Sequence, residues 1–482
     1  MAGAAQNIVL VTVDCFRYDR CGFAGHHRNT TPFLDELASE STVFDAAYAS
    51  GPDTSESFPG ILAGRLSGDC VYVDSPTRKA IPADAETLAS HLRQHGYETA
   101  ATISNPQLTR RRNFDAGFDR FENLRVPEAE EKNTSGAARE RESDVPLLRR
   151  LSVGERLYQF RERLRGRDSL PAPYRLPIVA LREYQYRTEW PTVQSDEILE
   201  RAGAAIAEAT EPFFLWVHLM DLHGPLHPDT VNAGGLCRAT RRKQFAWDAD
   251  RMADIQQPAC GLRYDSALRH VDSQLSGLHD RLQSEGFAEE TAFIVTGDHG
   301  ESLHDRGLYG HRHHYLYNDL LHVPLLVNRS GTENAAKRVQ TPVSLAWLHR
   351  LATDIAGVPP GPFPQTPDGD LFCEPDEDFI LSDSIGTGGH SVAVRHLETG
   401  IKQIYHSGNT EGLEGAVDRR ELYDVQLDRG ERTPLNPDRI EGASRLTDRS
   451  ESLVIHPDEL PELDETLSEE TEDRLRELGY LK

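Results

Sequence analysis

The sequence predicts an α/β fold, with a mainly parallel central sheet flanked by helices and a small C-terminal α+β subdomain. Short runs of apolar and β-branched residues alternate with segments of helical periodicity along most of the chain. The apolar runs are nearly continuous, as in strands covered by helices on both faces, whereas a strand with one solvated face alternates apolar and polar residues. In addition, residues that can bind a cation follow several of these runs, where open α/β sheets bind their ligands.

Five segments have the composition of buried strands. The first, NIVLVTVD, is apolar for only about seven residues before an aspartate, whereas a membrane-spanning helix needs about 20 apolar residues. Its N-terminal flank lacks the basic residues of a secretory signal, so we expect neither an export signal nor a membrane span. The predicted strands cover residues 7–14, 97–104, 213–220, 291–298 and 323–328.

The segments between these strands predict helices. The clearest runs from about Leu262 to Glu285, where apolar residues recur at intervals of three and four and so lie on one helix face. Thr31 and Pro32 form a typical helix start. The other predicted helices cover residues 86–96 and 196–209.

The chain divides into two expected parts. Residues 1–365 form the larger α/β domain, and residues 366–482 form the small subdomain, with a β-hairpin at 391–406 and a terminal helix. A Pro- and Gly-rich segment at 359–370 has the composition of a linker. Residues 125–192 are rich in arginine and glutamate and too long for a simple loop, so they predict an insertion, either a lid or a solvated surface excursion.

The charge balance is strongly acidic, with 52 basic and 78 acidic residues and a formal net charge of −26. Such a chain repels nucleic-acid backbones and anionic lipid surfaces, so neither is an expected partner. Only six of the basic residues are lysines, which indicates a protein from a salt-adapted organism, although a GC-rich genome gives a similar composition. The six cysteines show no metal-ligand spacing or disulfide pattern, which favours a reduced, cytoplasmic protein.

Three predicted strands end in residues that can bind a divalent cation. Because the carboxyl ends of parallel strands share one edge of a sheet, these side chains are expected to meet. Aspartates together with a histidine suit a divalent cation. A single aspartate after a strand is more often a helix cap or a turn residue, and the coincidence of three strand ends is what favours a site. The residues are Asp14 after the first strand, His218, Asp221 and His223 around the third, and Asp298 and His299 after the fourth.

Motifs spread almost from end to end resemble the sulfatase family of the alkaline-phosphatase superfamily. The opening strand with its aspartate, the segment SFPGILAGR, and the strand PFFLWVHLMDLHGP each match a family motif, as do VTGDHGESLHDRGLYGH and ELYDVQLDRGERTPLNP. With the acidic composition, the chain resembles sulfatase-like hydrolases of salt-adapted archaea. The match is weakest over residues 125–192. The resemblance implies a catalytic α/β domain that hydrolyses sulfuric or phosphoric esters.

The resemblance also implies a nucleophile ten residues before Gly64, which is Thr54. Sulfatases carry Cys-x-Pro-x-Arg from this position, and the cysteine becomes formylglycine. This chain reads Thr-Ser-Glu-Ser-Phe instead, so no formylglycine is expected. Superfamily members that cleave phosphodiesters or transfer phosphoglycerol use a threonine directly, and metal coordination activates its hydroxyl. Ser55 and Ser57 are the alternative nucleophiles, and Thr54 could instead only cap the following helix.

The metal set that the resemblance implies is Asp14, Thr54, Asp298 and His299, holding one divalent ion. Cys15 stands where the family usually has a second aspartate. Calcium is the ion that resemblance to sulfatases suggests. Manganese or zinc is the ion that the Asp-His pair suggests, because imidazole is a poor ligand for calcium.

Transfer of a sulfuryl or phosphoryl group also needs donors to its oxygens and an acid for the leaving group. By resemblance, His223 is the histidine on the substrate side and His311 lies near the leaving group, so both are predicted catalytic residues. Asn105 and Arg17 are predicted to bind the substrate anion, although a structural turn or a surface ion pair would explain either residue.

The function predicted is therefore metal-dependent hydrolysis of sulfuric or phosphoric esters, by attack of a metal-bound threonine hydroxyl through a covalent intermediate. One alternative is a phosphodiester or phosphonate hydrolase, or a phospho-group transferase, of the same superfamily. Another is a non-catalytic relative that binds an anion or a glycan. The expected substrate is a small anionic ester, with sulfated and phosphorylated glycans among the candidates. No feature of the sequence predicts the oligomeric state.

Overall fold

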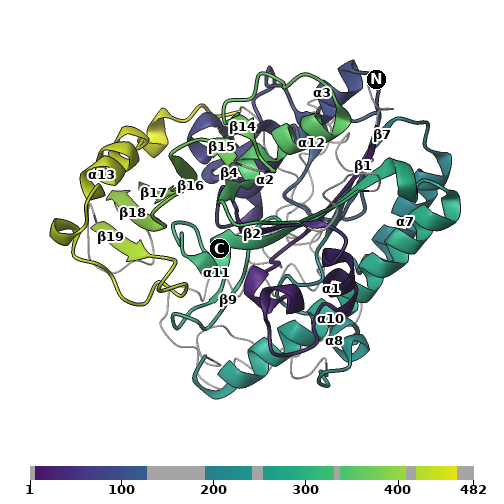
Figure 1. Cartoon of the computed structure of the whole chain (residues 1–482), viewed down its shortest axis with the longest axis horizontal. Coiled ribbons are helices and arrows are strands. Elements are labelled where there is room, and N and C mark those ends of the chain that lie inside the picture. Colours follow the sequence, from purple (N-terminus) through teal and green to yellow (C-terminus); the bar gives the residue numbers. More distant parts are fainter. Residues whose placement is uncertain are drawn as a thin grey trace, which may run out of the picture.

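The computed structural model describes residues 6–126, 190, 192–240, 253–329, 337–372, 374–408 and 419–463. Its centre is a nine-stranded sheet between two layers of helices (Figure 1). Across the sheet the strands follow the order β12-β2-β11-β8-β1-β7-β5-β6, and β13 also pairs with β2. Their bounds are Asn7–Val13 (β1), Thr42–Tyr48 (β2), Glu98–Ile103 (β5), Arg120–Asn123 (β6), Phe213–Leu219 (β7), Thr291–Gly297 (β8), His322–Asn328 (β11), Lys337–Val339 (β12) and Val343–Ser344 (β13).

Most neighbouring strands of this sheet are parallel, and β11 is the exception. The pairs of β1 with β7 and β8, of β5 with β6 and β7, and of β2 with β12 and β13 are parallel. β11 is antiparallel to both β8 and β2. The mainly parallel α/β sheet predicted from the sequence is thus confirmed, and the five predicted strands lie within one residue of their expected limits.

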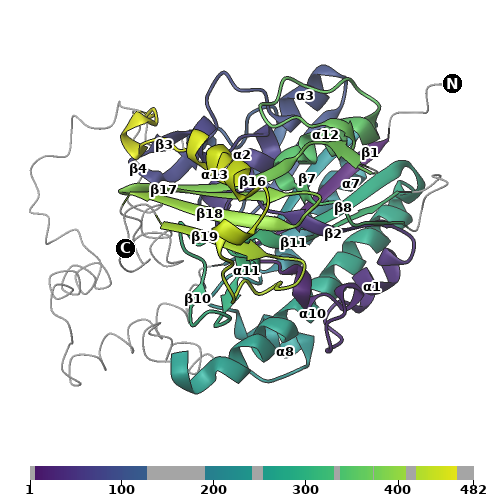
Figure 2. The same ribbon diagram turned by 60° about the vertical axis from the view of Figure 1, so that its left-hand side comes forward.

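Helices cover both faces of the sheet, as Figures 1 and 2 show. Along the central strand β1, Ile8 and Leu10 pack into the core under one layer, while Val9, Val11 and Val13 pack into the core under the other. This two-sided burial explains why the strand is continuously apolar. The first layer contains α2 (Thr54–Ala63), α3 (Leu88–Gln94) and α12 (Leu348–Ala356), and the second contains α1 (Pro32–Ala38), α7 (Ser195–Glu208), α8 (Pro228–Gly234) and α10 (Ala253–Glu285).

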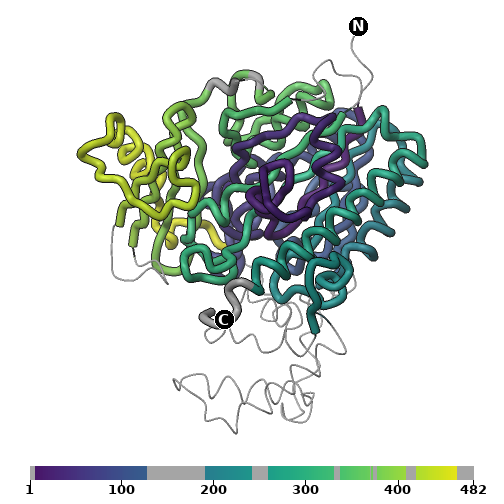
Figure 3. The backbone as a smooth tube through the Cα atoms, turned by 60° about the horizontal axis from the view of Figure 1, so that its bottom comes forward, coloured from purple at the N-terminus to yellow at the C-terminus, as the bar shows by residue number. Residues whose placement is uncertain are grey.

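The second layer is organised around the long helix α10, which contacts α1, α7 and α8. Figure 3 shows the N-terminal residues around α1 lying against this helix. Asp272 of α10 accepts hydrogen bonds from the backbone N–H groups of Phe33 and Leu34, at 2.8 and 2.9 Å. These N–H groups belong to the first turn of α1 and so have no acceptor within that helix. The Asp272 carboxylate of α10 therefore provides their hydrogen-bond acceptors.

The C-terminal part contains a four-stranded antiparallel sheet in the order β16-β17-β18-β19. The predicted hairpin at 391–406 is confirmed as β17 and β18. Val392 and Val394 pack under α13, whereas Ala393 and Ile404 join the main core, so this sheet lies between the two. The bounds are Phe379–Gly386 (β16), Gly389–His396 (β17), Ile401–Gly408 (β18), Arg419–Asp424 (β19) and Ala443–Ser452 (α13).

Two sequence predictions fall on residues that the structure does not describe. Nearly all of the insertion predicted at 125–192 and the whole terminal helix after residue 463 are outside the described ranges. The division at residues 365 and 366 remains a prediction. Within the described part of the chain, each helix is too short or too polar to cross a membrane.

Candidate active site

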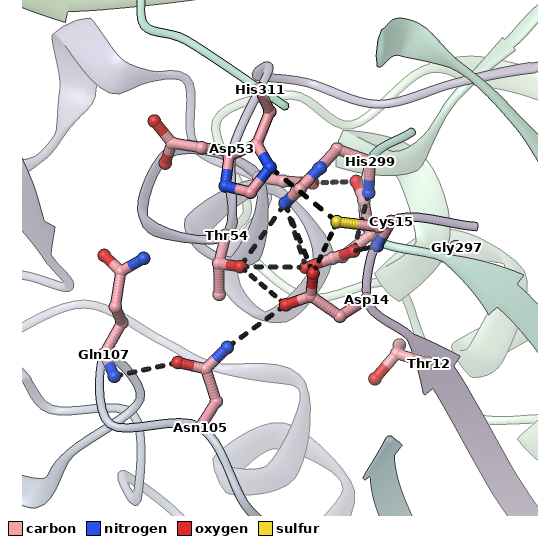
Figure 4. Close-up of polar contacts among 12 residues, drawn as sticks. Thr12, Asp14, Cys15, Asp53, Thr54, Asn105, Gln107, Gly297, His299 and His311 are labelled. Atoms are coloured by element: carbon pink, nitrogen blue, oxygen red, sulfur yellow. Dashed lines mark hydrogen bonds and ion pairs between the residues drawn. The ribbon is translucent and has the colours of Figure 1, made fainter. Parts of the chain in front are cut away.

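Four chain segments bring polar side chains to one edge of the central sheet (Figure 4). Asp14 follows β1, Asn105 follows β5, and Asp298 and His299 follow β8. Thr54 is the first residue of α2, whose N-terminus lies at the same edge. All five side chains are fully buried. The structure therefore brings together residues that are up to 285 positions apart, as the strand-end argument predicts.

The hydroxyl of Thr54 lies at the centre of this group. Its Oγ1 is 3.1 Å from Asp14 Oδ2, 3.2 Å from Asp298 Oδ2 and 3.4 Å from His299 Nε2. The position is fixed by the start of α2, where the Asp53 carboxylate accepts a hydrogen bond from the backbone N–H of Glu56. An aspartate at this position is a strong helix N-cap, so the local sequence itself places Thr54 in the first turn.

Asp14, Asp298 and His299 have donor atoms close enough to hold one metal ion, all within 4.8 Å of one another. The His299 Nδ1–H donates to the carbonyl of Gly300 at 2.7 Å, which leaves Nε2 free to act as a ligand. This Nε2 is 3.7 Å from Asp298 Oδ2 and 3.9 Å from Asp14 Oδ1. Oxygen and imidazole donors in this arrangement fit a divalent cation.

The electrostatics of the two carboxylates also fit a cation. Burial raises the pKa of Asp298 far above its usual range, and the charge of Asp14 raises it further. Burial also disfavours the ionised form of Asp14, but neighbouring imidazoles, including that of His218, outweigh this effect and hold the pKa of Asp14 well below its usual range. Two buried carboxylates this close resist joint ionisation unless positive charge lies between them. A divalent cation would supply that charge.

Hydrogen bonds from two neighbouring residues fix the ring of His218 beside the carboxylate of Asp14. Trp216 Nε1–H donates to Thr12 Oγ1 at 3.0 Å, and Thr12 Oγ1 lies 2.9 Å from His218 Nδ1. The other nitrogen of His218, Nε2, is 3.7 Å from Asp14 Oδ2. His218 was predicted among the cation-binding residues, with a buried strand histidine as the alternative, and the structure places it against a candidate metal ligand, where such partners orient the ligand.

Asn105 and Gln107 lie on one side of Thr54 (Figure 4). Asn105 Nδ2 donates to Asp14 Oδ2 at 3.3 Å, and its Oδ1 accepts the backbone N–H of Gln107 at 2.8 Å. Gln107 is 4% exposed, and its Nε2 has no hydrogen-bond partner within the described ranges. An unpaired buried donor is costly, so this amide is a candidate for binding a ligand. The sequence analysis missed Gln107, whose only signal is its place two residues after Asn105.

His223 and His311 lie together beside His299. The ring centroids of His223 and His311 are 5.1 Å apart, and those of His299 and His311 are 4.6 Å apart. Burial lowers the pKa of His223 to about 4, so its ring is neutral. Burial also acts to lower the pKa of His311, but the Glu301 carboxylate, 3.3 Å from its Nδ1, outweighs this effect and raises that pKa to about 9.

Two predicted residues have partners outside this group. Asp221 Oδ1 accepts hydrogen bonds from the hydroxyls of Ser195 and Thr230, at 3.2 and 3.3 Å. Arg17 is the other. Its guanidinium donates to Asp19 at 2.8 Å, to Asp305 at 2.5 Å and to the carbonyl of Glu301 at 2.9 Å. These partners take up both ends of the guanidinium. Arg17 is therefore not brought together with Thr54, although it holds the segment that carries Glu301.

Comparison with known proteins identifies the family. The sulfatase family profile matches residues 6–358, which is most of the chain. The chain belongs to the sulfatase family. Membership confirms the family predicted from the motifs and makes the protein a hydrolase that acts on ester bonds.

One sequence relative agrees with this assignment, and several solved structures share the fold. The arylsulfatase of Clostridium perfringens is 23% identical over 365 residues, which are 67% of this chain and 69% of the relative. Among solved structures, the phosphonate monoester hydrolase of Agrobacterium radiobacter has a TM-score of 0.60 at 17% identity, covering 93% of this chain and 94% of that one. BT4656, solved with its substrate D-glucosamine-2-N,6-O-disulfate, has a TM-score of 0.61 at 14% identity, covering 99% and 98%. These structures share the fold.

The serines next to Thr54 have structural partners. Ser55 Oγ donates to the carbonyl of Thr77 at 3.0 Å and accepts from the backbone N–H of Lys79 at 2.8 Å and from Arg112 at 2.5 Å. Ser57 Oγ donates to the backbone carbonyl of Asp298 at 2.5 Å. The hydroxyl in contact with the candidate metal ligands is that of Thr54. The structure thus distinguishes three neighbouring hydroxyls that the sequence left as alternatives.

Cys15 also points into the site, which the sequence analysis did not foresee. Its thiol is fully buried and donates to Asp14 Oδ1 at 2.9 Å. The sulfur is also 3.5 Å from Glu301 Oε2 and 3.7 Å from His311 Nδ1. Cys15 follows a predicted ligand directly, but its orientation depends on a backbone turn that its residue type does not reveal.

Proposed function

We propose that this sulfatase-family hydrolase cleaves phosphoric or sulfuric esters with a divalent metal ion, and that Thr54 is its nucleophile. The supporting observation is the position of Thr54 Oγ1, 3.1–3.4 Å from Asp14, Asp298 and His299. The absence of a cysteine from residues 54–58 excludes the usual precursor of formylglycine there. A hydroxyl nucleophile favours phosphodiesters or phosphonate monoesters over sulfate monoesters as substrates.

Asp14, Asp298, His299 and Thr54 are the residues that would hold the ion. A divalent cation there would lower the pKa of the Thr54 hydroxyl and neutralise the charge of the transferred group. The other steps depend on side chains of this chain.

In the first step, Thr54 Oγ attacks the phosphorus or sulfur atom of the ester. The new Oγ–P or Oγ–S bond forms while the bond to the leaving oxygen breaks, and the proton of the hydroxyl passes to Asp298 Oδ2, 3.2 Å away. His311, with a pKa raised to about 9, is protonated at neutral pH and donates its proton to the leaving oxygen. Water then cleaves the threonine ester and regenerates the hydroxyl.

His223 acts as the base for the second step, and Gln107 binds an oxygen of the ester. The neutral ring of His223 accepts the proton of the attacking water in the second step, because its pKa of about 4 leaves the acceptor nitrogen unprotonated. The Gln107 amide donates to an ester oxygen with the Nε2 that has no partner among the described residues. Both donors and acceptors are thus present before substrate binds.

The testing experiment is a substrate screen of metal-supplemented protein at high salt. It compares four substrates that share the same aryl leaving group: a bis-aryl phosphate, an aryl phosphonate, an aryl phosphate and an aryl sulfate. We expect the bis-aryl phosphate or the phosphonate to turn over fastest, and peptide mass spectrometry of a quenched reaction to locate an adduct on Thr54. Fastest turnover of the aryl sulfate, together with a formyl group on Ser55 or Ser57, would overturn the proposal.

A further inference from the structure

We propose that Cys15 is a ligand of the same metal ion and that its sulfur makes the site select zinc over calcium. The inference rests on the metal site of the proposed function. It adds a fourth protein side chain to Asp14, Asp298 and His299, and it narrows the identity of the ion.

The first argument is the position of the sulfur relative to the other donors. Cys15 Sγ is 2.9 Å from Asp14 Oδ1, which is itself 3.9 Å from His299 Nε2. The sulfur and one nitrogen each of His299 and His311 form a second group of possible ligands within 4.8 Å of one another. This group is separate from that of Asp14, Asp298 and His299, and the two groups share His299. Zinc lies about 2.3 Å from sulfur and about 2.0–2.2 Å from nitrogen or oxygen, so donors on one ion lie about 3–4.5 Å apart. Metal binding would therefore replace the 2.9 Å hydrogen bond between Cys15 and Asp14 with a slightly longer separation.

The second argument is the backbone that carries Cys15. Its φ of 61° is in the left-handed region, which non-glycine residues rarely adopt. The turn is held by the backbone N–H of Cys15, which donates to Asp298 Oδ1 at 3.3 Å, and by the hydroxyl of Tyr264, which donates to the Cys15 carbonyl at 2.6 Å. Figure 4 shows the sulfur directed toward the carboxylates and His299. Such strain, held by surrounding contacts, is typical of functional positions.

The third argument is the chemistry of the donor set. Calcium takes six to eight oxygen ligands. This site offers two carboxylates, an imidazole and a thiol, all fully buried. Thiolate and imidazole both favour zinc over calcium, and the Thr54 hydroxyl adds one oxygen donor to this set.

The decisive test uses metal-free protein and cobalt(II), which replaces zinc and reports its ligands by absorption. The full-length wild type should show a near-ultraviolet thiolate-to-cobalt charge-transfer band at one cobalt per chain. Cys15→Ser should bind cobalt without this band. Cys237→Ser changes a cysteine in the loop after α8 and should keep the charge-transfer band. Only a Cys15→Ser protein that still binds one cobalt per chain assigns the band to Cys15, so binding of cobalt by the variant also shows that it has folded.

Competition dialysis with metal analysis then tests selectivity. Wild type should retain zinc against excess calcium, and Cys15→Asp should shift the occupancy toward calcium by at least ~10-fold. Cobalt bound without the charge-transfer band, or equal zinc preference in wild type and Cys15→Asp, would overturn the role of Cys15 while leaving the metal site intact. Failure of the proposed function would differ, because then Asp298→Ala would bind metal as well as wild type does.

Discussion

The three neighbouring hydroxyls at residues 54, 55 and 57 differ in what their oxygens contact, and this difference should appear in kinetics. Thr54→Ala removes the hydroxyl that touches Asp14 and Asp298, so the rate should fall at least ~10³-fold. Thr54→Ser should retain measurable turnover, because it keeps an oxygen at the same place. Initial rates on the best substrate of the screen measure both effects.

Ser55→Ala is the matched control for this prediction. The Ser55 oxygen serves Thr77, Lys79 and Arg112, so its loss should lower the free energy of unfolding by about 1–3 kcal/mol. The rate per folded molecule should stay within about tenfold of wild type. An inactive but stable Ser55→Ala protein, beside an active Thr54→Ala protein, would show that the nucleophile has been assigned to the wrong residue.

His311 and Glu301 predict how activity depends on pH. The pKa of His311 is raised to about 9, so the ring carries its proton below that value and loses it as the pH rises through it. Catalysis that needs this proton should therefore fall on the alkaline side, at or below pH 9, because a bound cation nearby lowers the pKa. Profiles of kcat/KM against pH for wild type and Glu301→Gln measure the effect. The fall should move to lower pH in Glu301→Gln, which removes the charge that raises the pKa.

His311→Gln gives a second measurement of the same role. If His311 protonates the leaving oxygen, the variant should lose far more rate on alkyl esters than on nitrophenyl esters, since a nitrophenolate leaves without a proton. Equal losses on both ester types would indicate that His311 only supports the site.

Many residues of the candidate site could be predicted from the sequence. Motifs identify the residues, and the shared edge of the parallel strands brings them together. Asp14, Thr54, Asp298 and His299 converge, and their roles remain predictions. Gln107 was missed because its importance lies in an unpaired amide nitrogen, which depends on every neighbouring residue in the folded chain. Likewise, only the tertiary structure shows that Arg17 is taken up by Asp19 and Asp305.

At the scale of elements, the N-terminus of α2 positions the nucleophile. Asp53 caps the helix and lies 2.7 Å from His313 Nδ1, which in turn is 3.5 Å from Glu56 Oε2. Burial acts to lower the pKa of His313, but the charges of Asp53 and Glu56 outweigh it and raise that pKa to about 10. A protonated imidazole thus joins the cap to the first turn of the helix.

Asp53→Ala should lower the free energy of unfolding by about 1–2 kcal/mol, because it removes the helix cap. It should also lower kcat, since the first turn that carries Thr54 is no longer fixed. Asp53→Asn keeps the capping oxygen and removes only the charge opposite His313, so it should recover most of the stability. Chemical denaturation and steady-state kinetics of both variants check this. Equal loss of stability in the two variants would show that the ion pair, rather than the cap, holds the helix start.

Three strands of the central sheet that the sequence analysis missed have two physical causes. β2 is partly polar because Asp45 lies within it, and that residue accepts hydrogen bonds from Tyr18 and from Arg338 of β12. Its polarity is satisfied by chain segments far away in the sequence, so local pattern gave no sign of a strand. β12 and β13 are only three and two residues long, below the length at which periodicity is measurable. The long apolar strands, in contrast, are visible because two helical layers bury them.

At the scale of the whole molecule, the net charge of −26 should couple stability to salt. Self-repulsion of the carboxylates disfavours the compact state, and salt screens it as the Debye length falls from about 10 Å at 0.1 M to about 3 Å at 1 M. The midpoint of thermal unfolding should therefore rise with KCl over this range. Sucrose at matched osmolality is the control, because it has no charge and screens nothing. An unchanged or lower midpoint in KCl would contradict this account.

The central position of β1 has a consequence for how the chain is made. Ile8 of β1 pairs with Phe214 of β7 on one side and with Ala292 of β8 on the other. The first strand to leave the ribosome therefore has both of its neighbours only after β7 and β8 are synthesised. At about 5–20 residues per second, translation reaches Thr291 only after roughly 15–60 s. During that interval β1 has no hydrogen-bonded neighbour on its β8 side, and α12 of the first helical layer is not yet made. The nascent protein is thus a candidate client for chaperones, and truncated chains that end before β8 should aggregate rather than fold into a smaller enzyme.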